Sequence, residues 1–176
     1  MSMDVTPWLL EQLRSSARGF AGTVEQIPSE RLSVTPPYPR WLGEWSAARH
    51  VFHMLYHERK FPLAFARKCL QLPPLESLDE KENIAWQLWD QDVPHTLAAF
   101  LQARQNLLDL LAKFAPEAWE APREQEEWGA ITLRWTATKA YQHTSEHTHN
   151  VLRLLIFWDC AAYEEQELLK RESKDA

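Results

Sequence analysis

Residues 133–158 read LRWTATKAYQHTSEHTHNVLRLLIFW and form the clearest helical pattern in the chain. Its apolar residues recur at steps of three and four, which is the spacing of one face of an α-helix. Thr132 precedes the run and is a plausible cap for the start of that helix. The same face carries Leu133, Ala137, Ala140, His143, His147, Val151, Leu154 and Trp158. We therefore predict a long amphipathic helix, which either continues through residues 161–170 or is followed there by a short extra helix.

Three other segments share this helical period, and proline-rich connections separate them. They are Thr6–Gln26, a helix that begins near Ser46 and runs to Leu72 with a kink at Pro62, and the run from Pro94 to Phe114.

A short helix is predicted between Glu80 and Trp89, and no segment shows a convincing strand pattern. Four long helices with connections of unequal length favour an all-α fold, namely a single-domain antiparallel four-helix bundle that spans residues 1–176. We expect a disordered tail from about residue 171.

Composition and charge exclude several classes of protein. The 176 residues contain 19 Lys and Arg against 25 Asp and Glu, a net charge of −6, so nucleic acid is not an expected partner. No run of eighteen apolar residues predicts a membrane span, and no secretory signal opens the chain, which favours a cytoplasmic location. The two cysteines, Cys69 and Cys160, have no partner at metal or redox spacing and are expected to be buried small residues.

The histidines are the main chemical signal, because six of the seven fall on two predicted helices. His143 and His147 are four residues apart on the apolar face of the last helix, which suits two imidazoles that bind one ion. The alternative is a pair of core histidines that are hydrogen-bonded to neighbours.

A second histidine column, His50, His53 and His57, lies on the helix that begins near Ser46. It points away from Val51, which favours a solvated polar face, although one of the three side chains could face the interior. Periodicity leaves open which one that is.

These residues carry a resemblance to a known family. Trp45 and Ser46, followed after six residues by His53 and then by Glu58, are similar to the second helix of the DinB-like (DinB/YfiT-like) metalloenzyme superfamily. The stretch 129–133, which leads to the HxxxH pair of the last helix, resembles that superfamily's last bundle helix.

The resemblance implies a four-helix bundle that holds a divalent metal through His53, His143 and His147, with His50 or His57 as the alternative to His53. Many relatives carry another histidine after the last ligand, whereas residues 150–152 here are Asn, Val and Leu. Functions specific to a subfamily therefore do not transfer.

Three neutral imidazoles suit Zn or Ni and leave a coordination position for water or substrate. The resemblance therefore implies a metal-dependent enzyme that acts on a small-molecule substrate, either a thiol S-transferase or a hydrolase. Glu146 and Glu58 are the candidate catalytic or orienting carboxylates, each with a solvated surface role as the alternative. Residues 143–147 also match the HxxEH pattern of inverted zinc proteases, but only 29 residues follow His147, too few for that larger fold.

The competing class is a non-catalytic helical protein, either a small-ligand binder or a dimeric interaction module, with structural histidines. A homodimer is compatible with both classes. The tryptophans are expected mainly in the core or at a dimer surface, with a pocket near the metal as the alternative; they include Trp86, Trp89, Trp119, Trp128 and Trp135.

Overall fold

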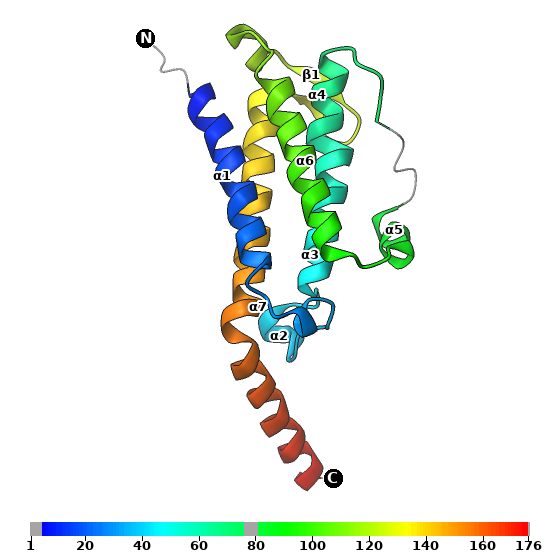
Figure 1. Ribbon diagram of the computed structural model, residues 1–176, viewed down its shortest axis with the longest axis vertical. Helices are drawn as coiled ribbons and strands as arrows, with labels where there is room; N and C mark the ends of the chain where they lie inside the picture. The colour runs from blue at the N-terminus through cyan, green and yellow to red at the C-terminus, as the bar shows by residue number, and fades with distance from the viewer. Residues whose placement is uncertain (1–4, 76–80, 176) are drawn as a thin grey trace.

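The structure is a computed structural model that describes residues 5–75 and 81–175 (Figure 1). Seven α-helices are assigned in this part of the chain: α1 Thr6–Val24, α2 Pro39–Leu42, α3 Ala47–Glu58, α4 Ala64–Cys69, α5 Glu82–Leu88, α6 Val93–Leu111 and α7 Leu133–Asp175. Short 3₁₀ turns lie at Ser29–Arg31 and Pro116–Trp119.

Local sequence signals explain where the helices begin. The Ser46 hydroxyl accepts a hydrogen bond from the Arg49 amide (3.2 Å) and caps α3. The Asp92 carboxylate accepts one from the His95 amide (2.9 Å) and caps α6. These short polar side chains satisfy amide groups that have no partner in the first turn of a helix.

The predicted kink at Pro62 is a π-helical turn, Arg59–Leu63, which joins α3 to α4. Proline lacks the amide hydrogen that an α-helix needs at an interior position. The wider turn accommodates Pro62 while the chain stays helical, and both the proline and Phe61 are buried.

Helices α1, α3, α6 and α7 pack along one another, but their directions differ from the antiparallel order that the sequence predicts. In Figure 1, α1 and α7 run downward while α3 and α6 run upward, so each of these two pairs is parallel. The physical reason is the connection that contains α5, which returns the chain to the end at which α3 began.

The core consists of two apolar clusters, one toward each end of the packed helices. One contains Leu13, Leu107 and Ala140, and the other contains Phe20, Phe100 and Val151. On α3, α6 and α7, polar residues fall between the members of the two clusters: Glu58, Arg104 and Thr144, all buried. This polar layer is where the candidate site lies.

The absence of strands is a wrong prediction. β1 (Arg123–Gln125) pairs antiparallel with β2 (Gly129–Ile131) in a small hairpin before α7. The Gln125 side chain accepts hydrogen bonds from the amides of Glu127 and Trp128, both 2.7 Å, and Gly129 takes a positive φ of 69°. Three-residue strands held by such a turn give no alternating pattern for sequence reasoning to detect.

Helix α7 is continuous from Leu133 to Asp175, so residues 161–170 belong to the same helix. It also passes position 171, where we expect disorder. Helix-favouring residues and an i,i+3 ion pair between Glu167 and Lys170 (2.8 Å) account for the extension. Cys160 on this helix is exposed, contrary to the expected burial, and Cys69 is partly buried.

Among residues 5–75 and 81–175, none of the helices combines the length and the apolar character that crossing a bilayer requires.

Candidate metal centre

Five histidines converge between α3 and α7. His53 is central: its ring centroid lies 4.9 Å from that of His143 and 4.7 Å from that of His147. His57 packs against His143 with a centroid distance of 3.9 Å, and His50 packs against His147 at 5.0 Å.

One group of three can hold a metal ion in the described part of the chain, and it consists of His53, His143 and His147. Their ligand nitrogens all lie within 4.8 Å of one another. The His143 Nε2 is 3.0 Å from the His53 Nε2 and 3.2 Å from the His147 Nε2. The structure thus brings together the three residues that the family resemblance implies as ligands.

A carboxylate orients the first of these rings. The Nδ1 of His53 lies 2.9 Å from the Glu82 Oε1, which also receives an ion pair from Arg49 at 2.7 Å. Burial by itself would raise the pKa of Glu82, but the His53 hydrogen bond and the Arg49 charge lower it overall. An ionised Glu82 keeps the proton of His53 on Nδ1, which leaves the Nε2 lone pair free to bind a metal.

Sequence reasoning missed Glu82 because it lies on α5, 29 residues from His53, in a segment with mixed periodicity. No local pattern marks this contact. The only sequence signal is the predicted short helix between Glu80 and Trp89, which carries the carboxylate.

A histidine orients the third ring. The Nδ1 of His147 is 2.8 Å from the Nδ1 of His50, so one of these nitrogens donates to the other. If His147 donates, its Nε2 lone pair faces the other two ligand candidates. The ring of Trp45, which precedes the α3 cap residue, has centroid distances of 5.0 Å to His53 and 5.9 Å to His147.

The reading of the α3 histidines as a solvated column is wrong. His50 is buried, and both His53 and His57 are partly buried. Because α3 contacts both α6 and α7, it buries more than one face, which a single apolar stripe in the sequence does not reveal.

Burial keeps the imidazoles of His50, His57, His143 and His147 neutral at physiological pH. It lowers the pKa of His147 to about 3 and those of His50 and His57 to about 4, and the neighbouring histidines lower them further. The pKa of His143 is also far below its usual value, chiefly because of burial. A neutral imidazole is the form that coordinates a metal, so the donor set fits a divalent ion that accepts nitrogen ligands.

The metal-free protein should lose stability as the pH falls from about 6.5 toward 4. His50 has a pKa of about 4 in the folded chain and about 6.5 when unfolded, so the unfolded state binds more protons in this window. The lowered pKa of His50 therefore adds about 3 kcal/mol to the free energy of unfolding, and this stabilisation is complete above pH 6.5. Urea unfolding of chelator-treated protein at pH 7.5, 5.5 and 4.5 measures it, and His50→Gln should flatten the profile relative to the exposed control His95→Gln. Equal slopes for the two variants would contradict this prediction.

A buried ion pair begins at the residue that follows His57 on α3 and joins Glu58 to Arg104. The Oε1 and Oε2 of Glu58 accept hydrogen bonds from Nε and Nη2 of Arg104, at 2.7 and 2.9 Å. Arg104 also donates to the Leu13 carbonyl and to the Thr144 hydroxyl, both at 2.9 Å. This network joins α1, α3, α6 and α7 at the level of the site.

The two carboxylates proposed from the sequence therefore have different surroundings. Glu58 is fully buried and bonded to Arg104, whereas Glu146 is exposed on α7. The carboxylate that contacts a histidine of the group is Glu82.

A comparison with protein families agrees with this geometry. The family model of the DinB superfamily matches residues 9–151, a range that includes all three ligand candidates. The chain belongs to the DinB superfamily. Searches of the curated proteins and of the solved structures find no match. The family assignment thus rests on the family model and accords with the helices and the histidine group.

Beside the histidines this DinB protein has a cavity of about 630 Å³. Its wall includes His53 and His57, the aromatic rings of Tyr56, Phe61 and Trp128, and the charged groups of Lys60, Glu82, Glu126 and Glu127. The Lys60 ammonium donates a hydrogen bond to the Tyr56 hydroxyl (2.9 Å). A cavity of this size accommodates a small molecule.

The tryptophans divide between the pocket and the packing. Trp128, at the hairpin tip, lines the cavity and packs against Phe61 and Trp135. Trp119 is buried in the core, and Trp86 and Trp89 pack against Phe52. Both alternatives drawn from the sequence are thus found, at different tryptophans.

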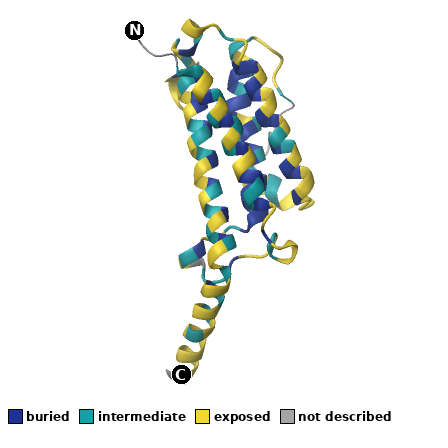
Figure 2. Cartoon of the chain, turned by 60° about the vertical axis from the view of Figure 1, so that its left-hand side comes forward, coloured by how far each residue is buried: buried dark blue, intermediate teal, exposed yellow. Residues whose placement is uncertain are grey.

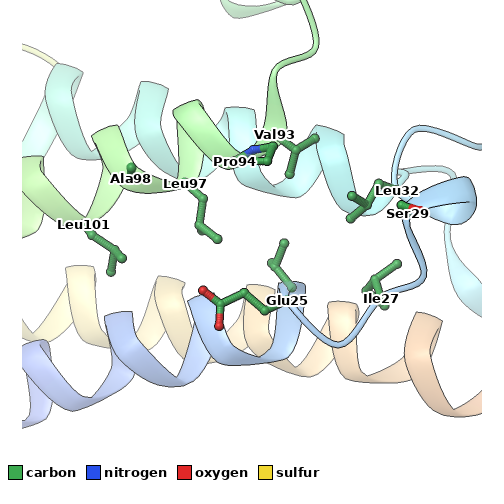
Figure 3. Close-up of a pocket in the computed structure, with 10 residues that line it drawn as sticks. Glu25, Ile27, Ser29, Leu32, Val93, Pro94, Leu97, Ala98 and Leu101 are labelled. Carbon is green, nitrogen blue, oxygen red and sulfur yellow. The ribbon is translucent and has the colours of Figure 1, made fainter.

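A second cavity of about 480 Å³ lies between the end of α1 and the start of α6 (Figure 3). Aliphatic side chains such as Leu97 and Leu101 line it, and Glu25 is the one charged group among the residues drawn. None of the five clustered histidines is in this lining, so the cavity beside His53 is the candidate substrate pocket.

Proposed function

We propose that this chain is a four-helix-bundle, metal-dependent enzyme of the DinB superfamily that acts on a small molecule. The observation that carries the proposal is the convergence of three histidine nitrogens beside a cavity of about 630 Å³. His53, His143 and His147 would hold the ion, and the donor set favours Zn or Ni.

When bound, a divalent ion of this kind acts as a Lewis acid that makes a thiol or a water nucleophilic near neutral pH. The reaction class is accordingly a thiol S-transfer or a hydrolysis. The protein's own residues set the conditions: Glu82 holds the proton of His53 on Nδ1, and burial keeps the imidazoles of His143 and His147 unprotonated.

Pocket residues would bind and orient the substrate. The Trp128 ring and the Phe61 ring offer apolar contact area, and the Lys60 ammonium can attract a negatively charged group. Glu126 and Glu127 at the hairpin tip would oppose an anion there, so the neutral, aromatic part of a substrate belongs beside Trp128.

Activity assays on the metal-reconstituted protein test this function. Zinc- and nickel-loaded protein should catalyse either thiol addition to a small electrophile or hydrolysis of small amides and esters, and the chelator-treated protein should not. Trp128→Ala should raise KM by about ten-fold, the effect of losing an aromatic contact, with unchanged metal content. The exposed Trp8 on α1 provides the control Trp8→Ala, which should leave KM unchanged. Metal-loaded protein that is inactive in both panels would favour a non-catalytic ligand binder.

A further inference from the structure

The C-terminal half of α7 has an apolar stripe that faces solvent. Leu152, Ile156, Cys160 and Tyr163 follow one another at steps of three and four residues, and all four are exposed. Ile156 is 61% exposed and Tyr163 is 64% exposed. Such large apolar side chains aligned on one exposed helix face are typical of an interaction surface.

This stripe is not the face by which α7 packs on its own chain. Val151, Leu154 and Ala161 are buried against the other helices. At about 100° per residue, Leu154 lies roughly opposite both Leu152 and Ile156 on the helix. Figure 2 shows the lower part of α7 largely exposed where it leaves the packed helices.

The charges along the stripe are self-complementary. One side of the stripe carries a column of residues seven positions apart, Arg153, Cys160 and Glu167. If a second copy of the helix runs in the opposite direction with Cys160 at the centre, Arg153 lies opposite Glu167 of that copy. The two-fold symmetry repeats this Arg–Glu pair on the other side of the axis.

We propose that two copies of this chain form a homodimer through antiparallel α7 helices, with the two-fold axis near Cys160. Ile156 of each copy packs beside Tyr163 of the other, in the manner of an antiparallel coiled coil. A two-fold interface of this kind uses the same patch on both subunits. A palindromic column of charge favours a second copy over an unrelated partner.

Two neighbouring charges are compatible with this arrangement. Asp159 lies near the axis, but it is already paired with Arg31 of its own chain (2.7 Å). Glu167 contacts Lys170 within the helix, a surface ion pair that contributes little and can be exchanged for Arg153 of the second copy.

The end of α7 extends beyond the packed helices of its own chain, which gives a physical reason for it to pack against a second copy. The Glu165 carboxylate accepts a hydrogen bond from the Tyr38 amide (3.1 Å), and the helix continues from there to Asp175 (Figure 1). A short helical segment without tertiary packing is marginally stable in water. A second α7 supplies that packing.

Sedimentation velocity and light scattering at micromolar concentrations test the interface. The wild-type chain should be a dimer, and Ile156→Glu should be a monomer at the same concentration. Leu169 is as exposed as Ile156 but lies on another face of the same helix, so the Leu169→Glu variant should stay dimeric. A monomeric wild type at 100 µM, or an equal effect of both variants, would overturn the proposal.

Charge reversal tests the register. Arg153→Glu and Glu167→Arg should each weaken the dimer by about ten-fold because each places like charges opposite one another twice. The double variant restores opposite charges and should recover the wild-type dissociation constant. A double variant weaker than both single variants would rule out this register.

A short bismaleimide cross-linker gives a third readout. It should join two chains through Cys160, so Cys69→Ser should cross-link as the wild type does and Cys160→Ser should not. Cross-linking that persists without Cys160 would place the axis elsewhere.

Discussion

Replacing His147 with alanine should weaken zinc binding by roughly a thousand-fold, because one of three ligands is lost from a site whose binding free energy is on the order of 10 kcal/mol. Competition with a chelator of known affinity at pH 7.5 measures this loss. The exposed His149, two residues along the same helix, supplies the control, and His149→Ala should bind zinc as the wild type does. Wild-type affinity in His147→Ala would show that His147 is not a ligand.

The same titration separates the ligands from the residue that orients them. Glu82→Ala should cost 10- to 100-fold in affinity, less than the loss of a ligand, because His53 keeps its nitrogen but loses the carboxylate that fixes its proton. The neighbouring residue Asn83 also accepts a hydrogen bond from Arg49 (3.1 Å). Asn83→Ala is therefore the matched control, because it removes a contact of Arg49 and keeps the contact between Glu82 and His53. Equal affinities for the two variants would indicate that Glu82 has no such role.

The second large effect concerns the ion pair between Glu58 and Arg104. Arg104→Met should lower the free energy of unfolding by about 3–5 kcal/mol, because it leaves a fully buried carboxylate without its partner. Urea unfolding of the metal-free protein at pH 7.5 measures the change. Glu146→Ala, at an exposed carboxylate on α7, should change stability by less than about 0.5 kcal/mol.

A double variant distinguishes the pair from the packing around it. Glu58→Leu combined with Arg104→Met removes both charges and should recover most of the stability lost by Arg104→Met alone. If the double variant is less stable than Arg104→Met, the loss of stability comes from altered packing rather than from the unpaired carboxylate. The zinc affinity of the double variant, compared with that of the wild type, shows whether the Glu58–Arg104 pair also positions the histidines.

Much of the helical structure could be predicted from the sequence because its causes are local. Periodic apolar residues, the Ser46 cap and the prolines mark where the long helices begin and end, and His143 and His147 fall on the buried face of α7 as expected. His53 was reached through a resemblance to a family rather than through periodicity, which favoured a solvated column for α3.

The remaining features depend on contacts between segments far apart in the sequence. The parallel pairing of α3 with α6 follows from the path of the connection through α5, which no periodicity reports. The contacts of Glu82 with His53 and of Glu58 with Arg104 span 29 and 46 residues. A carboxylate on a helix looks the same in sequence whether it faces water, an arginine or an imidazole.

The π-helical turn at Arg59–Leu63 separates two groups of residues that line the cavity beside the histidines. His53 and His57 precede the turn, whereas Phe61, which packs against Trp128 and Trp135, lies within it. A π turn holds one residue more than an α-helical turn, so deleting one residue there would move Phe61 relative to Trp128 and leave the α3 residues before the turn unchanged. Insertions and deletions at this point would therefore change the aromatic wall of the cavity without changing His53 and His57.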